Sequence, residues 1–412
     1  MSKTTAEETE PTVAQRRRLP RNVVLLGLVS MLNDVSSEMS LTILPLFLAN
    51  VLGVKTAVIG LIEGISETTA SLSRPLFGWL SDVRGRRKPF AFAGYALSAF
   101  SKPFLYFAGN WGVVLGVRFA DRLGKGVRTA SRDALIADST PPETRGLSFG
   151  FHRAADTAGA FIGLSVAALL VYLGQRSALT LNAGVYRNLV LAAMIPGFAA
   201  VLLMLIVRDM PRRVAQGPRE KVPLDPRFKA FLAIMVLFTL GNSSDAFLML
   251  RAQNVGLSVF HISLVLVLFN AIYTAIATPA GAWSDKVGRR RVILLGWLIY
   301  GAVYLAFALA AKPWHIWAAF ACYALYYALA EGTARALVAD FVAPERRGVA
   351  YGVYGTAIAI TALPASLIAG VLWQGIGGWG GLGPRAPFLF GSAMALLATI
   401  LLANLLRRPE PA

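Results

Sequence analysis

The sequence is poor in the residues that build disulfides and metal clusters. It contains 1 cysteine, Cys322, and 3 histidines among 412 residues. A single cysteine excludes an internal disulfide framework and a zinc site built from cysteine thiolates. The histidines are too few for a histidine-rich metal cluster. We therefore predict that the chain holds no metal and no cofactor.

Catalytic signatures are also missing. No Gly-x-x-x-x-Gly-Lys-Ser/Thr loop occurs, which argues against ATP-driven pumping within this chain. No Ser/His/Asp set is recognisable, and the few histidines leave little room for one. We predict that the protein is not an enzyme.

Charged residues are scarce as well. They make up 15% of the chain, whereas hydrophobic residues make up 56%. A soluble domain usually carries roughly a quarter charged residues. Apolar stretches of about 20 residues, enough to cross a bilayer as a helix, recur along the whole chain. The composition predicts an all-α polytopic membrane protein.

The apolar windows divide the chain into twelve predicted membrane helices. These are 22–49, 56–80, 89–108, 111–137, 147–173, 187–207, 228–253, 258–283, 291–310, 314–340, 348–373 and 386–406. We expect a six-helix bundle over 22–207 and a second over 228–406, joined by a proline-containing cytoplasmic loop at 208–227. Residues 1–21 and 407–412 are predicted to be cytoplasmic tails.

The positive charge is distributed unevenly. The formal net charge is +18, and the basic residues gather in alternate loops, such as 84–88, 208–229 and 286–291. That bias predicts that both termini are cytoplasmic and that the basic loops meet anionic lipid headgroups. This loop bias accounts for the positive net charge, so we do not expect the protein to bind nucleic acid. We expect a multi-pass protein of the cell membrane, which is the inner membrane if the source is a Gram-negative bacterium.

The two predicted halves repeat each other. Residues 78–88 match 281–291, and residues 134–146 match 336–348 at almost the same offset along the chain. Two long matches at nearly one offset are hard to obtain by chance. Six spans per half in a parallel repeat is the layout of a transporter whose site lies between its halves.

The first of these repeats carries a resemblance to a known family. It reads Gly-x-Leu-x-Asp-x-x-Gly-Arg-Arg-Lys over 78–88, and Arg122-Leu-Gly-Lys125-Gly126 follows in span four. Over essentially its whole length the chain resembles the major facilitator superfamily. Span five carries only part of that family's antiporter signature, because it has glycines but no proline.

The resemblance implies gating residues at the cytoplasmic helix ends. In that family such loops form charge contacts between the halves that break when the transporter opens inward. The matching positions are Gly78, Asp82, Gly85, Arg86, Arg87, Asp285, Gly288 and Arg289. The signature in span four likewise implies that Arg122 acts in proton coupling or gating.

Span four also carries an unusual number of charges. They are Arg118, Asp121, Arg122, Lys125, Arg128, Arg132 and Asp133. At 100° per residue they occupy one arc of about 140°. Charges at membrane depth normally face a cavity or a partner. We predict that Lys125 and Arg128 line a central cavity and attract an anionic group. The alternative is that these cations only pair with carboxylates of neighbouring helices.

Carboxylates in spans one and five are the candidates for proton coupling. Asp34 and Glu38 are four residues apart, hence on one face of span one. Asp156 lies four residues after His152, an arrangement that can relay protons. We predict that Asp34, Glu38 and Asp156 take part in coupling, with Asp34 as the carrier. A permanent ion pair with span four is the alternative for Asp34.

Further polar residues are candidates for solute binding. Asn33 and Glu63 are the candidates of the first half, and Asn242 and Asp245 those of the second, where 242–245 roughly mirrors 33–38. Two charge pairs within single helices are also predicted, Glu67 with Arg74 in span two and Glu331 with Arg335 in span ten.

These observations predict a secondary transporter of a small organic solute that works by alternating access. We expect protons as the coupling ion and a monomer, and we favour efflux slightly over uptake. The basic span four leaves uptake of a small anionic solute open. A divalent-metal exporter using Asp34, Glu38 and Glu63 is a further alternative, and a membrane solute receptor is the alternative of another class.

Overall fold

The computed structural model describes residues 19–141, 144–210, 225–342 and 347–405. The predicted tails and the middle of the predicted loop 208–227 lie largely outside these residues. The described part of the chain is almost wholly helical. This confirms the predicted all-α fold class.

The first half contains α1 (Arg21–Leu41), α2 (Leu44–Asn50), α3 (Thr56–Arg84), α4 (Lys88–Ser101), the 3-10 helix η2 (Lys102–Phe107), α5 (Trp111–Asp138), α6 (Arg145–Gln175) and α7 (Ala183–Ile206). The second half contains α8 (Pro226–Gly241), α9 (Ala246–Asn254), α10 (Val259–Val287), α11 (Arg289–Leu309), α12 (Pro313–Asp340), α13 (Arg347–Gln374) and α14 (Ala386–Leu405). These elements form twelve spans, as the apolar windows predict.

Three spans that the sequence predicts as continuous helices are broken. Span one divides into α1 and α2 just before Pro45, which cannot donate the backbone hydrogen bond of a continuing helix. Span three ends in η2, where Pro103 sits in the first turn. Span seven divides at 242–245, a run of Asn, Ser, Ser and Asp whose side chains compete with the backbone for hydrogen bonds.

Not every span is apolar enough to stand alone in lipid. By length and composition, eight helices of the described part qualify as membrane spans. The shortest exception is span three, in which α4 has only 14 residues. The other three are α3, α5 and α12, and they carry the charges discussed below. Their polar residues require a protected environment, which the arrangement of the halves provides.

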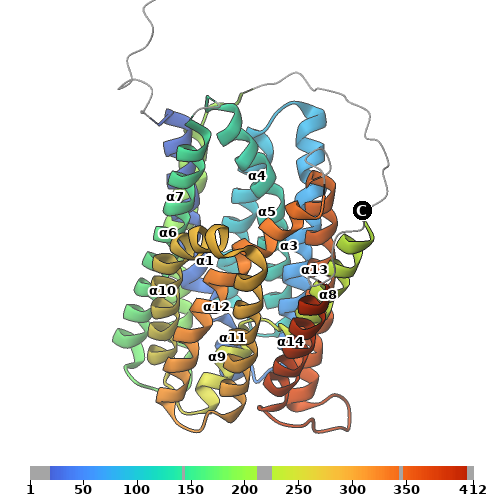
Figure 1. The fold of residues 1–412 in the computed structure, drawn as a ribbon. Helices are drawn as coiled ribbons and strands as arrows, with labels where there is room; N and C mark the ends of the chain where they lie inside the picture. The colour runs from blue at the N-terminus through green and yellow to red at the C-terminus, as the bar shows by residue number, and fades with distance from the viewer. Residues whose placement is uncertain (1–18, 142–143, 211–224, 343–346, 406–412) are drawn as a thin grey trace, which may run out of the picture.

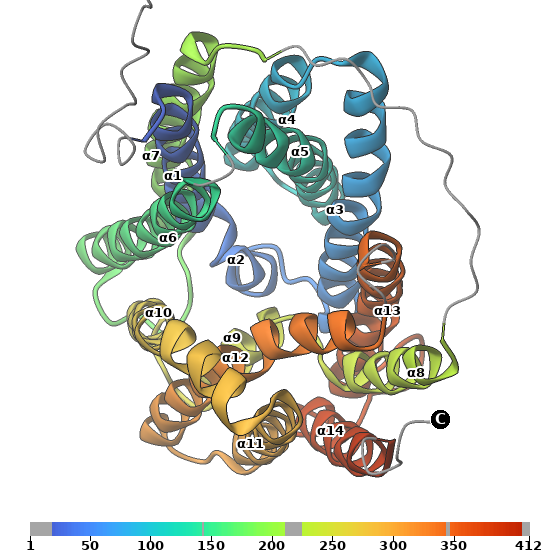
Figure 2. The same ribbon diagram turned by 45° about the horizontal axis from the view of Figure 1, so that its top comes forward.

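The helices form two groups that face each other (Figure 2). Helix α3 of the first half lies beside α13 of the second, and α6 lies beside α10. Helices α2 and α9, the second parts of the two broken spans, lie between the groups. We call the side of the molecule that carries the connections at 85–87, 139–141 and 288 the basic face. The other side, with the connections at 51–55, 176–182 and 255–258, is the opposite face.

Glycines allow the halves to approach closely along α3 and α13. A Cβ atom added to Gly60 would lie 2.2 Å from the carbonyl oxygen of Ser366, and one added to Gly370 would lie 2.4 Å from that of Thr56. Within the first half, a Cβ at Gly159 would lie 2.4 Å from the Met31 carbonyl oxygen, where α6 crosses α1. Small residues are the usual means of close helix packing in membranes.

A reciprocal pair of amides joins the halves at the opposite face. Asn50 Nδ2 donates to Gln253 Oε1 at 3.0 Å, and Gln253 Nε2 donates to Asn50 Oδ1 at 2.7 Å. Asn50 is the last residue of α2, and Gln253 is the last residue but one of α9. They are 203 positions apart, the same offset that relates Asp82 to Asp285 in the repeat. We call this contact the amide clasp. Nearby, the backbone N–H of Thr56 donates to Gln374 Oε1 at 2.7 Å. The opposite face is therefore closed in this structure.

Removing the amide clasp is expected to open the opposite face more often. Each bond contributes about 1 kcal/mol, so losing both in Asn50→Ala with Gln253→Ala should raise the open population roughly tenfold or more. The measurement is the labelling rate of a cysteine at cavity residue Thr42 (Thr42→Cys with Cys322→Ser) in oriented proteoliposomes. An impermeant maleimide is added at the opposite face.

The matched control for this experiment is Asn110→Ala. The Asn110 side chain accepts a hydrogen bond from the backbone N–H of Val113 at 3.1 Å and caps α5 within the first half. This substitution should leave the labelling rate unchanged. An equal rate in the clasp variant and in its parent would contradict the role of the clasp.

Candidate functional site

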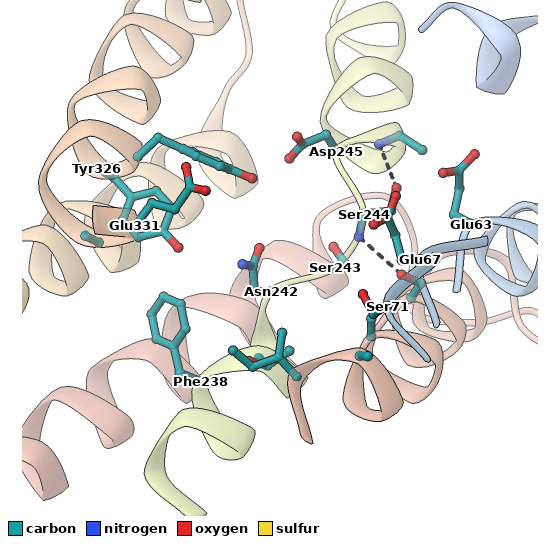
Figure 3. Close-up of a pocket in the computed structure, with 18 of the residues that line it drawn as sticks. Glu63, Glu67, Ser71, Phe238, Asn242, Ser243, Ser244, Asp245, Tyr326 and Glu331 are labelled. Atoms are coloured by element: carbon teal, nitrogen blue, oxygen red, sulfur yellow. Dashed lines mark hydrogen bonds between the residues drawn. The ribbon is translucent and has the colours of Figure 1, made fainter. Parts of the chain in front are cut away.

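A cavity of about 570 Å³ lies between the two halves. Helices α3 and α5 contribute to it from the first half, and α8, α11, α12 and α13 contribute from the second. Figure 3 shows side chains of both halves converging on this space. Its size is in the usual range for small-molecule sites.

The first-half wall is built from two ion pairs between α3 and α5. Arg118 Nη2 pairs with Glu63 Oε2, and one turn further along both helices Arg122 Nη2 lies 3.4 Å from Glu67 Oε1. The pair of Glu63 with Arg118 is almost fully buried, whereas the Glu67 side chain is 49% exposed. The spacing of four residues on each helix places both pairs on the cavity side. Glu67 thus pairs with Arg122 and not, as the sequence predicts, with Arg74.

The second-half wall contains a group of aromatic residues. Phe238, Trp297, Tyr326, Tyr327 and Tyr354 line the cavity from α8, α11, α12 and α13. The Phe238 ring stacks on Trp297 with centroids 4.4 Å apart, which holds both rings in place in this wall. This wall offers apolar area and ring faces to a solute.

The break in span seven brings polar groups to the cavity. The backbone N–H of Ser244 donates to Ser366 Oγ at 3.3 Å, and Tyr300 OH donates to the Gly241 carbonyl oxygen at 3.0 Å. Tyr323 OH donates to Asp245 Oδ1 at 2.8 Å. Unwound backbone is tolerated at membrane depth only where protein or a water-filled cavity satisfies it. These partners meet that condition.

A chain of polar contacts also crosses between the halves. Glu331 pairs with Arg335 at 3.2 Å, as their spacing predicts, and accepts a hydrogen bond from Tyr273 OH at 3.1 Å. Arg153 Nη2 of α6 donates to the same Tyr273 oxygen at 3.2 Å. Arg153 of the first half is thus connected, through Tyr273 of α10, to the cavity residue Glu331 of α12.

The proton-coupling candidates form a second polar cluster, inside the first half. Asp34 lies within the field of Asp156 on α6 and of the cations Arg128, Lys125 and Arg132 on α5. His152 Nδ1 lies 3.5 Å from Asp156 Oδ2. Helices α1, α5 and α6 therefore bring together residues that the sequence places far apart.

Lys102 is a buried cation that the sequence analysis misses. Its side chain is 1% exposed, and its Nζ donates to Ser36 Oγ at 3.0 Å and to Ser37 Oγ at 2.9 Å. Asp121, which accepts a hydrogen bond from Ser98, supplies an opposite charge to Lys102. A lysine beside a proline at the end of span three looks like an interfacial residue, and only the tertiary structure, in which its Nζ reaches two serines of α1, reveals its burial.

The charged stripe of span four does not face one cavity. Arg118 and Arg122 line the cavity between the halves. Arg128 instead lies over the Tyr95 ring, 5.0 Å from its centroid, between α4 and α5. Arg132 Nη1 donates to Ser30 Oγ of α1 at 3.0 Å. An arc of 140° is wide enough to contact three different neighbours, which periodicity alone does not separate.

The predicted solute-binding residues therefore lie in two places, some at the cavity and some within the first half. Glu63, Asn242 and Asp245 are among the residues that line the cavity. The described lining does not include Asn33, Lys125 or Arg128. Asn33 instead donates to Asp34 Oδ1 at 3.3 Å.

The predicted gating loops form ion pairs within each half. Arg87 pairs with Asp82 and lies 3.8 Å from Asp138, and Arg289 pairs with Asp340, the repeat counterpart of Asp138. These pairs join helices of one half. The Asp285 side chain lies outside the described part. Arg86 is exposed.

The glycines of these loops have a backbone role. Gly85 and Gly288 have φ angles of 62° and 98°, a conformation that favours glycine where a helix ends. A Cβ at Gly78 would lie 3.1 Å from the Ala130 Cβ, so α3 and α5 pack closely there.

A helical membrane protein with a cavity between two repeated halves has the architecture of a solute transporter. The chain matches the family model of the Major Facilitator Superfamily over residues 26–250 and 230–412. It is 35% identical over 395 residues to an uncharacterised MFS-type transporter of Methanocaldococcus jannaschii, covering 94% of this chain and 95% of that protein. The chain belongs to the major facilitator superfamily. It is a membrane transporter and not an enzyme.

Two more distant likenesses complete the comparison. The chain is 30% identical over 175 residues to multidrug resistance protein 2 of Bacillus subtilis, which covers 42% of this chain and 40% of that protein. The solved structure of the nucleoside transporter NupG superposes with a TM-score of 0.75 at 14% identity, covering 94% of this chain and 100% of that one. The second likeness concerns the fold alone.

Breaking the buried ion pair of the first-half wall should destabilise the protein. Glu63→Gln leaves the Arg118 charge uncompensated, which is expected to cost about 3 kcal/mol. The measurement is the midpoint of thermal unfolding in detergent. Replacing both partners, as Glu63→Gln with Arg118→Met, should recover much of the loss.

Glu67→Gln is the matched control, one turn away on the same helix. Its exposed pair is expected to contribute less than about 1 kcal/mol. Equal losses at Glu63 and Glu67 would show that burial does not set the energy of these pairs.

Proposed function

We propose that this protein is a proton-driven secondary transporter that exports a small organic solute by alternating access. The observation that carries the proposal is the cavity between the halves, because its walls come from both. A rocking motion of one half against the other would then change which side of the membrane the cavity meets.

The contacts between the halves support this motion. The amide clasp and the α3–α13 contact at Gly60 and Gly370 lie toward the opposite face. By the distribution of positive charge, we propose that the basic face is cytoplasmic, with both termini on that side of the cell membrane. The structure then corresponds to a state closed toward the outside.

The cluster around Asp34 supports proton coupling. Asp34 and Asp156 carry like charges on two helices that pack closely at Gly159. One added proton removes the repulsion between two such carboxylates and changes their balance with the cations of α5. Glu38, one turn along α1 from Asp34, and Arg122, which joins the cavity wall to α3, extend this proposed coupling system.

Two observations favour export: the aromatic residues of the second-half wall and the likeness to a multidrug resistance protein. The alternative hypothesis, uptake of an anionic solute, depends on Lys125 and Arg128. Neither residue is among the described residues that line the cavity. A metal exporter finds little support, since among the described residues no group of three or more His, Cys, Asp or Glu side chains could hold a metal ion. A receptor remains the competing class, and it would not exchange solute.

The experiment is counterflow and gradient-driven transport in proteoliposomes. Solutes are first screened by thermal stabilisation of the purified protein, and a labelled solute is then followed with and without an imposed pH gradient. Wild-type protein should exchange the solute in counterflow and accumulate it when a pH gradient is present. No exchange of any stabilising solute would favour the receptor.

Asp34→Asn should separate coupling from solute exchange. It removes the proposed proton carrier, so accumulation driven by the pH gradient should fall at least about tenfold while counterflow stays near the wild-type rate. Asp225→Asn is the control, because the Asp225 side chain caps α8 and asparagine caps equally well. Intact gradient-driven transport in Asp34→Asn would remove Asp34 from the coupling role.

A further inference from the structure

The charges that line the cavity do not balance. The described lining contains the carboxylates Glu63, Glu67, Asp245 and Glu331 and the guanidinium groups of Arg118, Arg122 and Arg335. Each arginine pairs with one glutamate, as described above. One negative charge, that of Asp245, is left over.

Asp245 has no cationic partner among the described residues. Its hydrogen-bond partner is the Tyr323 hydroxyl at 2.8 Å. The charged groups that act most strongly on it are Glu67 and Glu63, both of them carboxylates. Its side chain is exposed and lies at the cavity (Figure 3). A ligand in the cavity can therefore reach this carboxylate directly.

Aromatic rings surround this free carboxylate. Tyr323, which donates to Asp245, stacks on Tyr326 with centroids 5.7 Å apart, and its centroid lies 5.1 Å from that of Tyr327. Tyr326 and Tyr327 themselves line the cavity. Ring faces attract organic cations, most strongly where water is partly excluded. A carboxylate and ring faces in one place form a site for positive charge.

The first-half wall does not favour an anion in the same space. Its two arginines are already paired with Glu63 and Glu67, so an incoming anion would have to displace a carboxylate from a guanidinium. Hard metal ions need six or more oxygen ligands, which one carboxylate and phenolic hydroxyls do not supply.

We infer that the cavity binds an organic cation, with its ammonium group on Asp245 and its apolar body against the aromatic wall formed by Phe238, Trp297 and Tyr326. This names the substrate class of the proposed transporter and rests on that proposal. The bound cation neutralises the charge that the described lining leaves unpaired.

The test is direct binding to the purified full-length protein, measured by isothermal titration. The probes are benzyltrimethylammonium, the neutral N,N-dimethylbenzamide and the anionic phenylacetate, which have similar bodies and different charges. Wild-type protein should bind the cation at least about tenfold more tightly than the other two. Asp245→Asn should remove that preference, weakening cation binding at least about tenfold and leaving the amide unchanged.

Two further variants keep the outcome interpretable. Asp245→Glu retains the charge and should restore cation binding to within a few-fold of wild type, which separates loss of charge from loss of fold. Asp225→Asn removes a carboxylate outside the cavity and should bind as wild type. Equal binding of all three probes, or an unchanged cation affinity in Asp245→Asn, would overturn the inference.

Binding and transport results are distinguishable. If a screened solute shows counterflow but benzyltrimethylammonium does not bind, the inference about cations fails and the transporter stands. If the cation binds through Asp245 but neither it nor any other stabilising solute is exchanged, the site stands and the proposed function fails.

Discussion

The energetic cost of a charge at membrane depth determines how this protein is built. Arg118 and Glu63 can lie buried within the spans of α5 and α3 only because each neutralises the other. The same requirement places Lys102 against serine hydroxyls and within the field of Asp121. The helix faces that carry such groups cannot contact lipid. They must turn toward a partner or toward water, and this creates both the cavity and the charge cluster of the first half.

Much of the fold follows from the sequence because bilayer thickness limits helix length. Apolar windows and two internal repeats predict twelve spans and their division into halves. The breaks within spans are harder to predict from the sequence. Pro45 is a visible signal for the break in span one, whereas the run at 242–245 becomes a break because Ser366 and Tyr300 satisfy the freed backbone. Those partners lie in other helices, so their contribution depends on the tertiary structure.

The candidate site is predictable only in part, for a geometric reason. Helical periodicity identifies the face on which a residue lies but not the neighbour that the face meets. Arg122 and Arg128 share the charged arc of span four, yet one meets Glu67 at the cavity and the other meets Tyr95 of α4. The burial of Lys102 depends in the same way on where α1 passes. Asp245, in contrast, is a predicted solute-binding residue because of its place in the repeat, and it lies at the cavity.

The amide clasp has a consequence for how the two faces respond to their surroundings. Amide groups carry no net charge and do not titrate, so changes in pH or ionic strength leave their hydrogen bonds intact. The pairs of Arg87 and Arg289 at the other face are ionic and partly exposed, and mobile ions screen them. With the orientation proposed above, the contacts that close the external face do not respond to the pH or the salt of the medium, and sensitivity to salt is confined to the cytoplasmic face.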